Sequence, residues 1–101
     1  MTLAEAVEDA AGRLPGVERR EVPGIGGIEW LVGGRPFAAA SAGSVEFRLD
    51  PVVARAALGT PDTSVSGRGA EWVAFSPAEL DRFAVDRALA WLGAAHRRAA
   101  G

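Results

Sequence analysis

Turn signals follow one another at hairpin distance through the first half of the chain, and this spacing constrains the fold more than any other feature. The signals are Pro23–Gly27, Gly33-Gly34 and Ser41–Gly43, and they lie between a helix stop at Pro15-Gly16 and a helix start at Asp50-Pro51. Paired glycines accept the positive φ angles that a two-residue hairpin turn needs. Strands joined by such short connections are antiparallel, because parallel strands need a long crossover between them. The first half of the chain therefore predicts an antiparallel sheet.

Five segments have the composition or the alternation expected of strands. The expected strands are residues 17–22, 28–32, 35–40, 44–49 and 71–75. In the fourth segment, Val45, Phe47 and Leu49 alternate with Glu46 and Arg48, so one face is predicted to meet the core and the other to meet solvent. The mostly charged first segment predicts a solvated edge strand.

Three helices complete the predicted order. Thr2 with Glu5, and Ser76 with Glu79, each fit the capping box that marks a helix start. Asp50 followed by proline predicts the start of a short second helix. The last helix is predicted to begin at the second capping box and to continue almost to the end of the chain.

The predicted order is α-β-β-β-β-α-β-α, with residues 60–69 as the one sizeable irregular loop. A chain of 101 residues can bury a core without metal or disulfide bridges. Residues 1–101 are therefore predicted to form a single α+β domain. Its antiparallel sheet is expected to have four to five strands, with the helices packed on one face.

Cysteine, lysine, tyrosine, asparagine and glutamine are absent from the chain, and His96 is its one histidine. Most side chains that catalyse at neutral pH are therefore missing, which leaves carboxylates, arginines, hydroxyls and the backbone. His96 has no metal ligand among its neighbours at helical spacing, and we expect it to face solvent near the end of the last helix. No catalytic residue, metal site or cofactor is predicted.

The net charge of −2 and the isoelectric point near 5.3 predict no general attraction to nucleic acid or to anionic lipid. No apolar stretch approaches the roughly 20 residues that span a bilayer. The acidic N-terminus lacks the apolar region of a signal peptide. We therefore expect a cytoplasmic protein with no membrane partner.

Glu29 and Glu46 are predicted to share the outer face of the sheet, where two carboxylates can act as an acid–base pair if burial separates their pKa values. Alternating glutamate and arginine on strands is far more typical of a solvated face, and we favour that interpretation. Gly67-Arg68-Gly69 could bring backbone N–H groups and a guanidinium to an anion. A flexible turn is the more common meaning of such a sequence.

The segment from Trp72 to Phe75 is apolar on both sides. Trp72 and Ala74 alternate with Val73 and Phe75, so large apolar groups remain opposite whichever pair meets the helices. Leu31 similarly points to the face of the sheet opposite that of Ile28, Trp30 and Val32. We therefore expect an apolar patch on the outer sheet face. The leading prediction is a non-catalytic binding or interaction module that forms a homodimer through this patch, with Leu31, Val73 and Phe75 at the interface.

The alternative prediction is a small-molecule binder or small enzyme with an aromatic pocket between the sheet and the last helix. Tryptophans would line this pocket, and arginines would hold an anionic group of the ligand. The candidate ligand-binding residues are Trp30, Arg35, Arg48, Arg68, Trp72 and Trp91.

Several short stretches resemble the small bacterial luciferase-domain family, which is of unknown function despite its name. The matching stretches are Leu14-Pro15-Gly16-Val17, Gly34-Arg35-Pro36-Phe37, Trp72-Val73-Ala74-Phe75, Asp86-Arg87-Ala88-Leu89 and Ala95-His96-Arg97-Arg98-Ala99. The layout is also similar to the YjbR-type domains. That likeness would imply a nucleic-acid partner, which the acidic charge balance disfavours.

One departure from the luciferase-domain pattern limits what the resemblance implies. Members of that family often carry a His-x-His pair shortly after the phenylalanine matched to Phe37, and this chain has Ala39 and Ser41 at those positions. Any metal-binding or proton-transfer role of the pair is therefore not implied here. The light-emitting oxidation in the family name is not carried over either.

Overall fold

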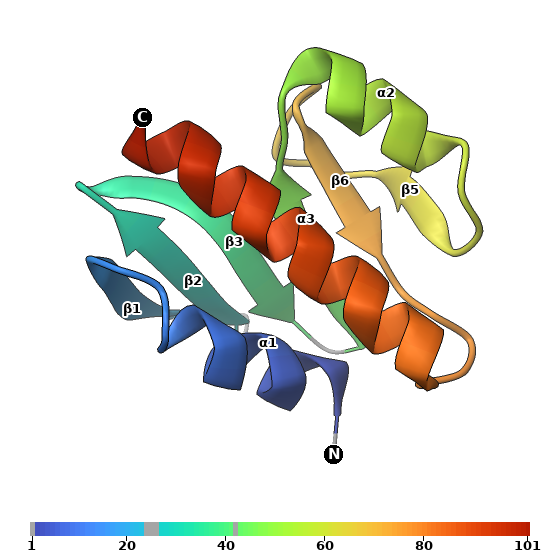
Figure 1. Cartoon of the computed structure of the whole chain (residues 1–101), viewed down its shortest axis with the longest axis horizontal. Helices are drawn as coiled ribbons and strands as arrows, with labels where there is room; N and C mark the ends of the chain where they lie inside the picture. Colours follow the sequence, from blue (N-terminus) through green and yellow to red (C-terminus); the bar gives the residue numbers. More distant parts are fainter. Residues whose placement is uncertain (1, 24–26, 42) are drawn as a thin grey trace.

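The computed structural model describes residues 2–23, 27–41 and 43–101, in which one antiparallel sheet is covered by helices (Figure 1). The helices are α1 (Leu3–Ala11), α2 (Pro51–Leu58) and α3 (Arg82–Ala100). The strands are β1 (Val17–Val22), β2 (Gly27–Val32), β3 (Arg35–Ser41), β4 (Ser44–Arg48), β5 (Thr63–Val65) and β6 (Trp72–Phe75). The turns expected over 23–27 and 41–43 include residues 24–26 and 42, which lie outside the described residues. None of the helices in the described ranges is long and apolar enough to cross a membrane.

The strand order in the sheet is β1-β2-β3-β4-β6-β5, and each neighbouring pair is antiparallel. The predicted α+β class is confirmed. The sheet has six strands instead of four or five, because β5 forms in the segment expected to be an irregular loop. Thr63 pairs with Phe75 and Val65 with Val73. Three residues are too few to show the alternation by which a strand is recognised in a sequence.

The first two helices begin where the sequence predicts. Thr2 Oγ1 accepts a hydrogen bond from the Glu5 N–H at 3.1 Å, and the Glu5 carboxylate accepts one from the Thr2 N–H at 2.8 Å. Both halves of the predicted capping box are therefore present. At α2, the Asp50 carboxylate accepts a hydrogen bond from the Val52 N–H at 3.0 Å, with Pro51 at the first helical position.

The start of α3 corrects the predicted position. The capping box expected at Ser76 and Glu79 is not used, and Asp81 is the N-cap of the helix. The Asp81 carboxylate accepts a hydrogen bond from the Ala84 N–H at 2.8 Å. β6 ends at Phe75 within the sheet, and the residues that follow carry the chain across to the layer of helices. The later of two acceptable caps therefore starts the helix.

One face of the sheet, here called the inner face, meets the helices. Val45, Phe47 and Leu49 point to it and are each no more than 1% exposed, as their alternation predicts. α3 crosses this face beside α1 (Figure 1), and its buried apolar side chains are spaced by three or four residues along one side of the helix. These side chains are Ala84, Ala88, Leu92 and Ala95. α2 adds Ala54 and Ala57 to the same core.

A β-bulge interrupts the pairing of β2 with β3. Trp30 pairs with Ala38, but Leu31 pairs with Pro36, so Phe37 is an extra residue on β3. Because of this extra residue, Phe37 and Ala38 both enter the inner-face core, where both are fully buried. In the part of β3 before the bulge, Arg35 and Pro36 therefore point to the opposite faces from those that regular alternation would give them.

The hairpin between β2 and β3 turns at the predicted pair of glycines. Gly33 has a φ of +58° and Gly34 a φ of +78°, in the left-handed region that favours glycine. A Cβ built at either position would meet no atom within 4 Å. The requirement for glycine here is therefore conformational and does not come from a close contact.

Candidate functional site

The three tryptophans predicted to line one pocket lie in different places. Trp30 is 1% exposed in the inner-face core. Trp91 of α3 packs on the same core, with its ring edge-on to Phe75 and the ring centroids 5.2 Å apart. Trp72 alternates with the core residue Val73 and so points to the opposite, outer face of the sheet. A pocket lined by all three tryptophans is therefore excluded.

The three predicted arginines do not share one site. Arg48 pairs with Trp72 and alternates with the core residue Phe47, so its side chain leaves the end of β4 on the outer side. Arg35 and Arg48 line one small pocket, which they share with Arg98 of α3. Arg68 lies on the outer face, where its guanidinium carbon is 5.1 Å from the centroid of the Trp72 ring. Arg98 was missed as a candidate because cations are favourable in the last turn of any helix, whether or not a ligand is present.

The residues predicted for a dimer interface are buried, which corrects that expectation. Val73 and Phe75 point to the inner face and are fully buried in the core. Leu31 alternates with Trp30 and lies on the outer face, but only 5% of it is exposed. The apolar patch expected at these residues is therefore absent from the surface, and the expected homodimer loses the feature that suggested it.

Charged side chains cover the centre of the outer face instead. Cross-strand pairing places Arg20, Glu29, Ala39 and Glu46 in one row across β1, β2, β3 and β4. Arg68, from the β5–β6 connection, lies over this row. Its Nη1 is 2.7 Å from Glu29 Oε2, and its Nε is 3.2 Å from Glu46 Oε1. Ala39 is 1% exposed, and its small side chain leaves room between the two carboxylates.

This ion-pair network corrects the expectation of a solvated face. The Glu29 side chain is only 11% exposed, and Arg20 Nη2 lies 2.5 Å from its second oxygen. Hydrogen bonds from Arg20 and then from Arg68 lower the pKa of Glu29 from its ordinary value of 4.5. Ser66 donates a hydrogen bond to Glu46, which fastens the β5–β6 connection to the sheet. A general acid needs a raised carboxyl pKa, so the lowered pKa of Glu29 indicates a structural role.

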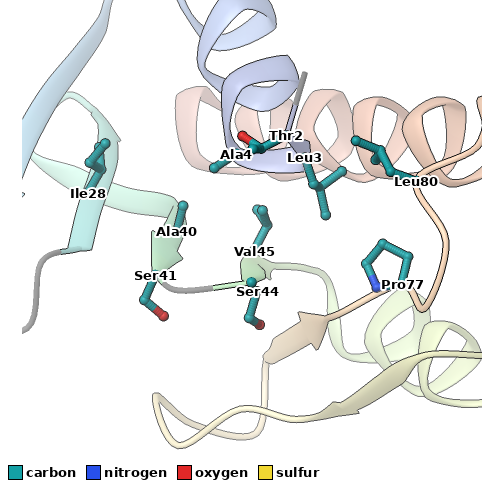
Figure 2. A pocket seen from close by; sticks show the side chains of 11 residues that line it. Thr2, Leu3, Ala4, Ile28, Ala40, Ser41, Ser44, Val45, Pro77 and Leu80 are labelled. Atoms are coloured by element: carbon teal, nitrogen blue, oxygen red, sulfur yellow. The ribbon is translucent and has the colours of Figure 1, made fainter.

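A pocket of about 550 Å³ lies between the inner face and the N-terminal end of α1 (Figure 2). We call it the α1 pocket. In Figure 2, Leu3 of α1 points toward Val45 of β4. Ile28 of β2 lies on one side of this pair, and Pro77 and Leu80 lie on the other. The remaining lining residues are Thr2, Ala4, Ala40, Ser41, Gly43 and Ser44.

The walls of the α1 pocket are mainly aliphatic. None of the described residues that line it carries a charge. Thr2, Ser41 and Ser44 are its hydroxyl-bearing residues, and in Figure 2 the side chains of Ser41 and Ser44 point away from Leu3, Ala40 and Val45. Pockets of roughly 300–1,000 Å³ with mostly apolar walls are typical of small-molecule sites. The pocket was not predicted, because its lining comes from several elements and contains no distinctive motif.

His96 lies away from the α1 pocket and is buried, which corrects the expectation that it faces solvent. It is 8% exposed. Its Nε2 is 2.9 Å from the carbonyl oxygen of Pro15, and its ring packs edge-on to Phe37 with the centroids 5.5 Å apart. The histidine therefore joins α3 to the turn between α1 and β1.

Within residues 2–23, 27–41 and 43–101, no three histidine or carboxylate side chains come together as a metal-binding group. Comparisons of the chain with family models, with curated proteins and with solved structures found no match. The resemblance to the luciferase-domain family and to the YjbR-type domains therefore stays a prediction.

Proposed function

We propose that the protein is a non-catalytic binding module that holds the apolar part of a small molecule in the α1 pocket. The observation that supports this proposal is the pocket itself, about 550 Å³ of space between aliphatic walls. Next to it, large core side chains such as Phe47 and Phe75 are fully buried. The space is thus a local feature at one end of the sheet and not a sign of loose packing throughout the core.

Apolar contact is the main interaction that the α1 pocket offers. Burial of apolar surface is worth about 25 cal/mol per Å², so a ligand that buries on the order of 200 Å² gains about 5 kcal/mol before the costs of association. The expected ligand is therefore compact and mainly aliphatic or aromatic.

The placement of the titratable groups supports binding over catalysis. Ser41 and Ser44 would need a neighbouring base to act as nucleophiles. The one histidine, His96, is held against the Pro15 carbonyl instead. The carboxylate of Glu29 is ion-paired on the other face of the sheet.

A pair of matched substitutions on β3 tests the pocket. Ala40 lines it, whereas Ala38, two residues earlier on the same face, is fully buried against packed core. Ala40→Leu places its added carbons in the pocket and should cost little stability, while Ala38→Leu should cost about 1–3 kcal/mol by overpacking. Urea unfolding followed by tryptophan fluorescence measures both.

Ligand binding is tested with the neutral fluorescent probe N-phenyl-1-naphthylamine, which brightens in apolar sites. The wild-type protein should bind the probe, and Ala40→Leu should weaken binding by about tenfold, the effect of losing roughly 1.4 kcal/mol of contact. Equal binding by the two proteins, or an Ala40→Leu variant as unstable as Ala38→Leu, would contradict the proposal.

Self-association, the other expectation from the sequence, is proposed as a second candidate through a different surface. Val52 of α2 and Val65 of β5 are 74% and 72% exposed, and α2 contacts β5, the strand at one edge of the sheet. Apolar side chains beside an unpaired strand edge favour pairing with a second copy. Light scattering across a concentration series tests this, with Val65→Lys expected to yield a monomer. A wild-type protein that is monomeric throughout the series rejects it.

A further inference from the structure

A second, smaller pocket is lined by three arginines that come from three different elements. Arg35 is the first residue of β3, Arg48 is the last residue of β4, and Arg98 lies in the last turn of α3. We call this the arginine pocket. Its volume is about 190 Å³, and it lies at the opposite end of β3 from the α1 pocket. The other lining residues are Phe37, Ala95 and Ala99.

The positive charge of the arginine pocket is only partly neutralised. Among the described residues, the carboxylate paired with these arginines is that of Glu71, which contacts Arg98 and lies 3.9 Å from Arg48 Nε. Arg35 instead donates a hydrogen bond to the carbonyl of Ala99 at 3.4 Å. Arginine stays protonated in proteins, so three positive charges face one negative charge.

The end of α3 does not remove this imbalance. A helix C-terminus carries the equivalent of roughly half a negative charge, which favours nearby cations. After Glu71 and this partial charge are counted, about one and a half of the three positive charges remain without a partner.

The β-bulge contributes to the convergence. Because Phe37 is the extra residue, Arg35 lies on the inner side of the sheet, toward α3. Phe37 and Ala95 form the apolar part of the pocket lining. Apolar lining lowers the local dielectric, which strengthens the attraction between guanidinium groups and an anion.

We propose that the arginine pocket binds a phosphoryl group carried by a small molecule. A dianionic phosphoryl group would neutralise the net charge of the three arginines and Glu71. Guanidinium groups match its oxygens with paired hydrogen bonds. The volume of about 190 Å³ is enough for a phosphoryl group, and the rest of a larger ligand would extend outside the pocket. This site is independent of the α1 pocket.

Titration of the full chain with inorganic phosphate and with pyrophosphate, at a salt concentration of about 0.1 M, tests the proposal. Isothermal titration gives the affinity, and amide chemical shifts locate the site, with the largest changes expected at Arg35, Phe37 and Ala99. Arg35→Gln should weaken binding by about tenfold, because it removes one charged hydrogen-bond donor. Glu71→Gln should tighten binding, because it removes the competing carboxylate.

Arg13→Gln is the matched control, since it makes the same change of charge in an exposed ion pair on α1. It should leave the affinity within about twofold of the wild type, because exposed charges farther away than roughly 10 Å are screened. Far-UV circular dichroism confirms that each variant is folded. Absence of binding at millimolar phosphate and pyrophosphate, equal losses in Arg35→Gln and Arg13→Gln, or tighter binding of acetate than of phosphate would each overturn the assignment.

Discussion

Replacement of Arg68 with methionine tests whether the outer-face ion pairs stabilise the fold. The change keeps the apolar stem of the side chain near Trp72 but leaves Glu29 and Glu46, 11% and 18% exposed, without their shared partner. A hydrogen bond to a charged group is worth about 1.5–3 kcal/mol. Arg68 is itself 28% exposed and Glu29 keeps its contact with Arg20, so solvent screening and the remaining pair reduce the loss. We expect the free energy of unfolding to fall by about 2 kcal/mol, which lowers Tm by about 10 °C in a domain of this size.

The effect should depend on pH in a defined direction. The pKa of Glu29 in the folded protein lies below its ordinary value of 4.5. A lowered folded pKa contributes stability that is complete above the unfolded value and is lost as the pH falls through the folded value. The variant lacks the share of this stabilisation that Arg68 supplies. The difference in unfolding free energy between the wild type and Arg68→Met should thus be full at neutral pH and shrink below about pH 4.5.

Urea unfolding at neutral pH and at a series of acid pH values measures this difference. Arg13→Met is the control, because its ion pair with Asp9 is short but the two side chains are 78% and 63% exposed. Such a pair should contribute less than about 1 kcal/mol. An Arg68→Met loss no larger than that of Arg13→Met, or one that persists unchanged in acid, would refute the structural role assigned to the network.

Three further substitutions have expected outcomes. His96→Phe keeps a ring against Phe37 but removes the partner of the Pro15 carbonyl, so urea unfolding should show a loss of about 1–2 kcal/mol; unchanged stability would mean that this hydrogen bond contributes nothing net. Gly34→Val places a β-branched residue at a φ of +78° and should lower Tm by more than 5 °C, the equivalent of roughly 1 kcal/mol or more. Gly34→Asn should lower Tm less, because asparagine tolerates a positive φ better than valine does. Phe83→Ser removes a ring that is 76% exposed, so stability should stay within about 0.5 kcal/mol; a larger loss would mean that the ring packs against the fold.

Local signals in the sequence predicted those parts of the fold that depend on near neighbours. The box formed by Thr2 and Glu5, and the proline after Asp50, each satisfy helix N–H groups within a few residues, so both starts were correct. The box at Ser76 failed because a local rule cannot choose between two adequate caps. In the structure Asp81 is the N-cap, after a connection that leads from β6 to the layer of helices.

Side-chain sites were less predictable, because they depend on which strands become neighbours. Arg35 and Arg48 were both candidates for an anion site, but nothing in their local sequence indicates that Arg98 joins them. Glu29 and Glu46 form an alternating pattern typical of a solvated face. Their burial results from Arg68, which is distant in the sequence from both. The alternation of residues along a strand does not show which distant side chain will cover it.

The extra residue at Phe37 makes one end of the molecule sensitive to chain length as well as to side-chain identity. Removal of a single residue from this part of β3 would restore regular alternation and turn Arg35 toward the opposite side of the sheet. An otherwise conservative deletion would thereby dismantle the arginine pocket while leaving every arginine in the chain. Homologues that share this pocket should therefore be sought by the number of residues between Gly34 and Ala38, and not by the presence of an arginine alone.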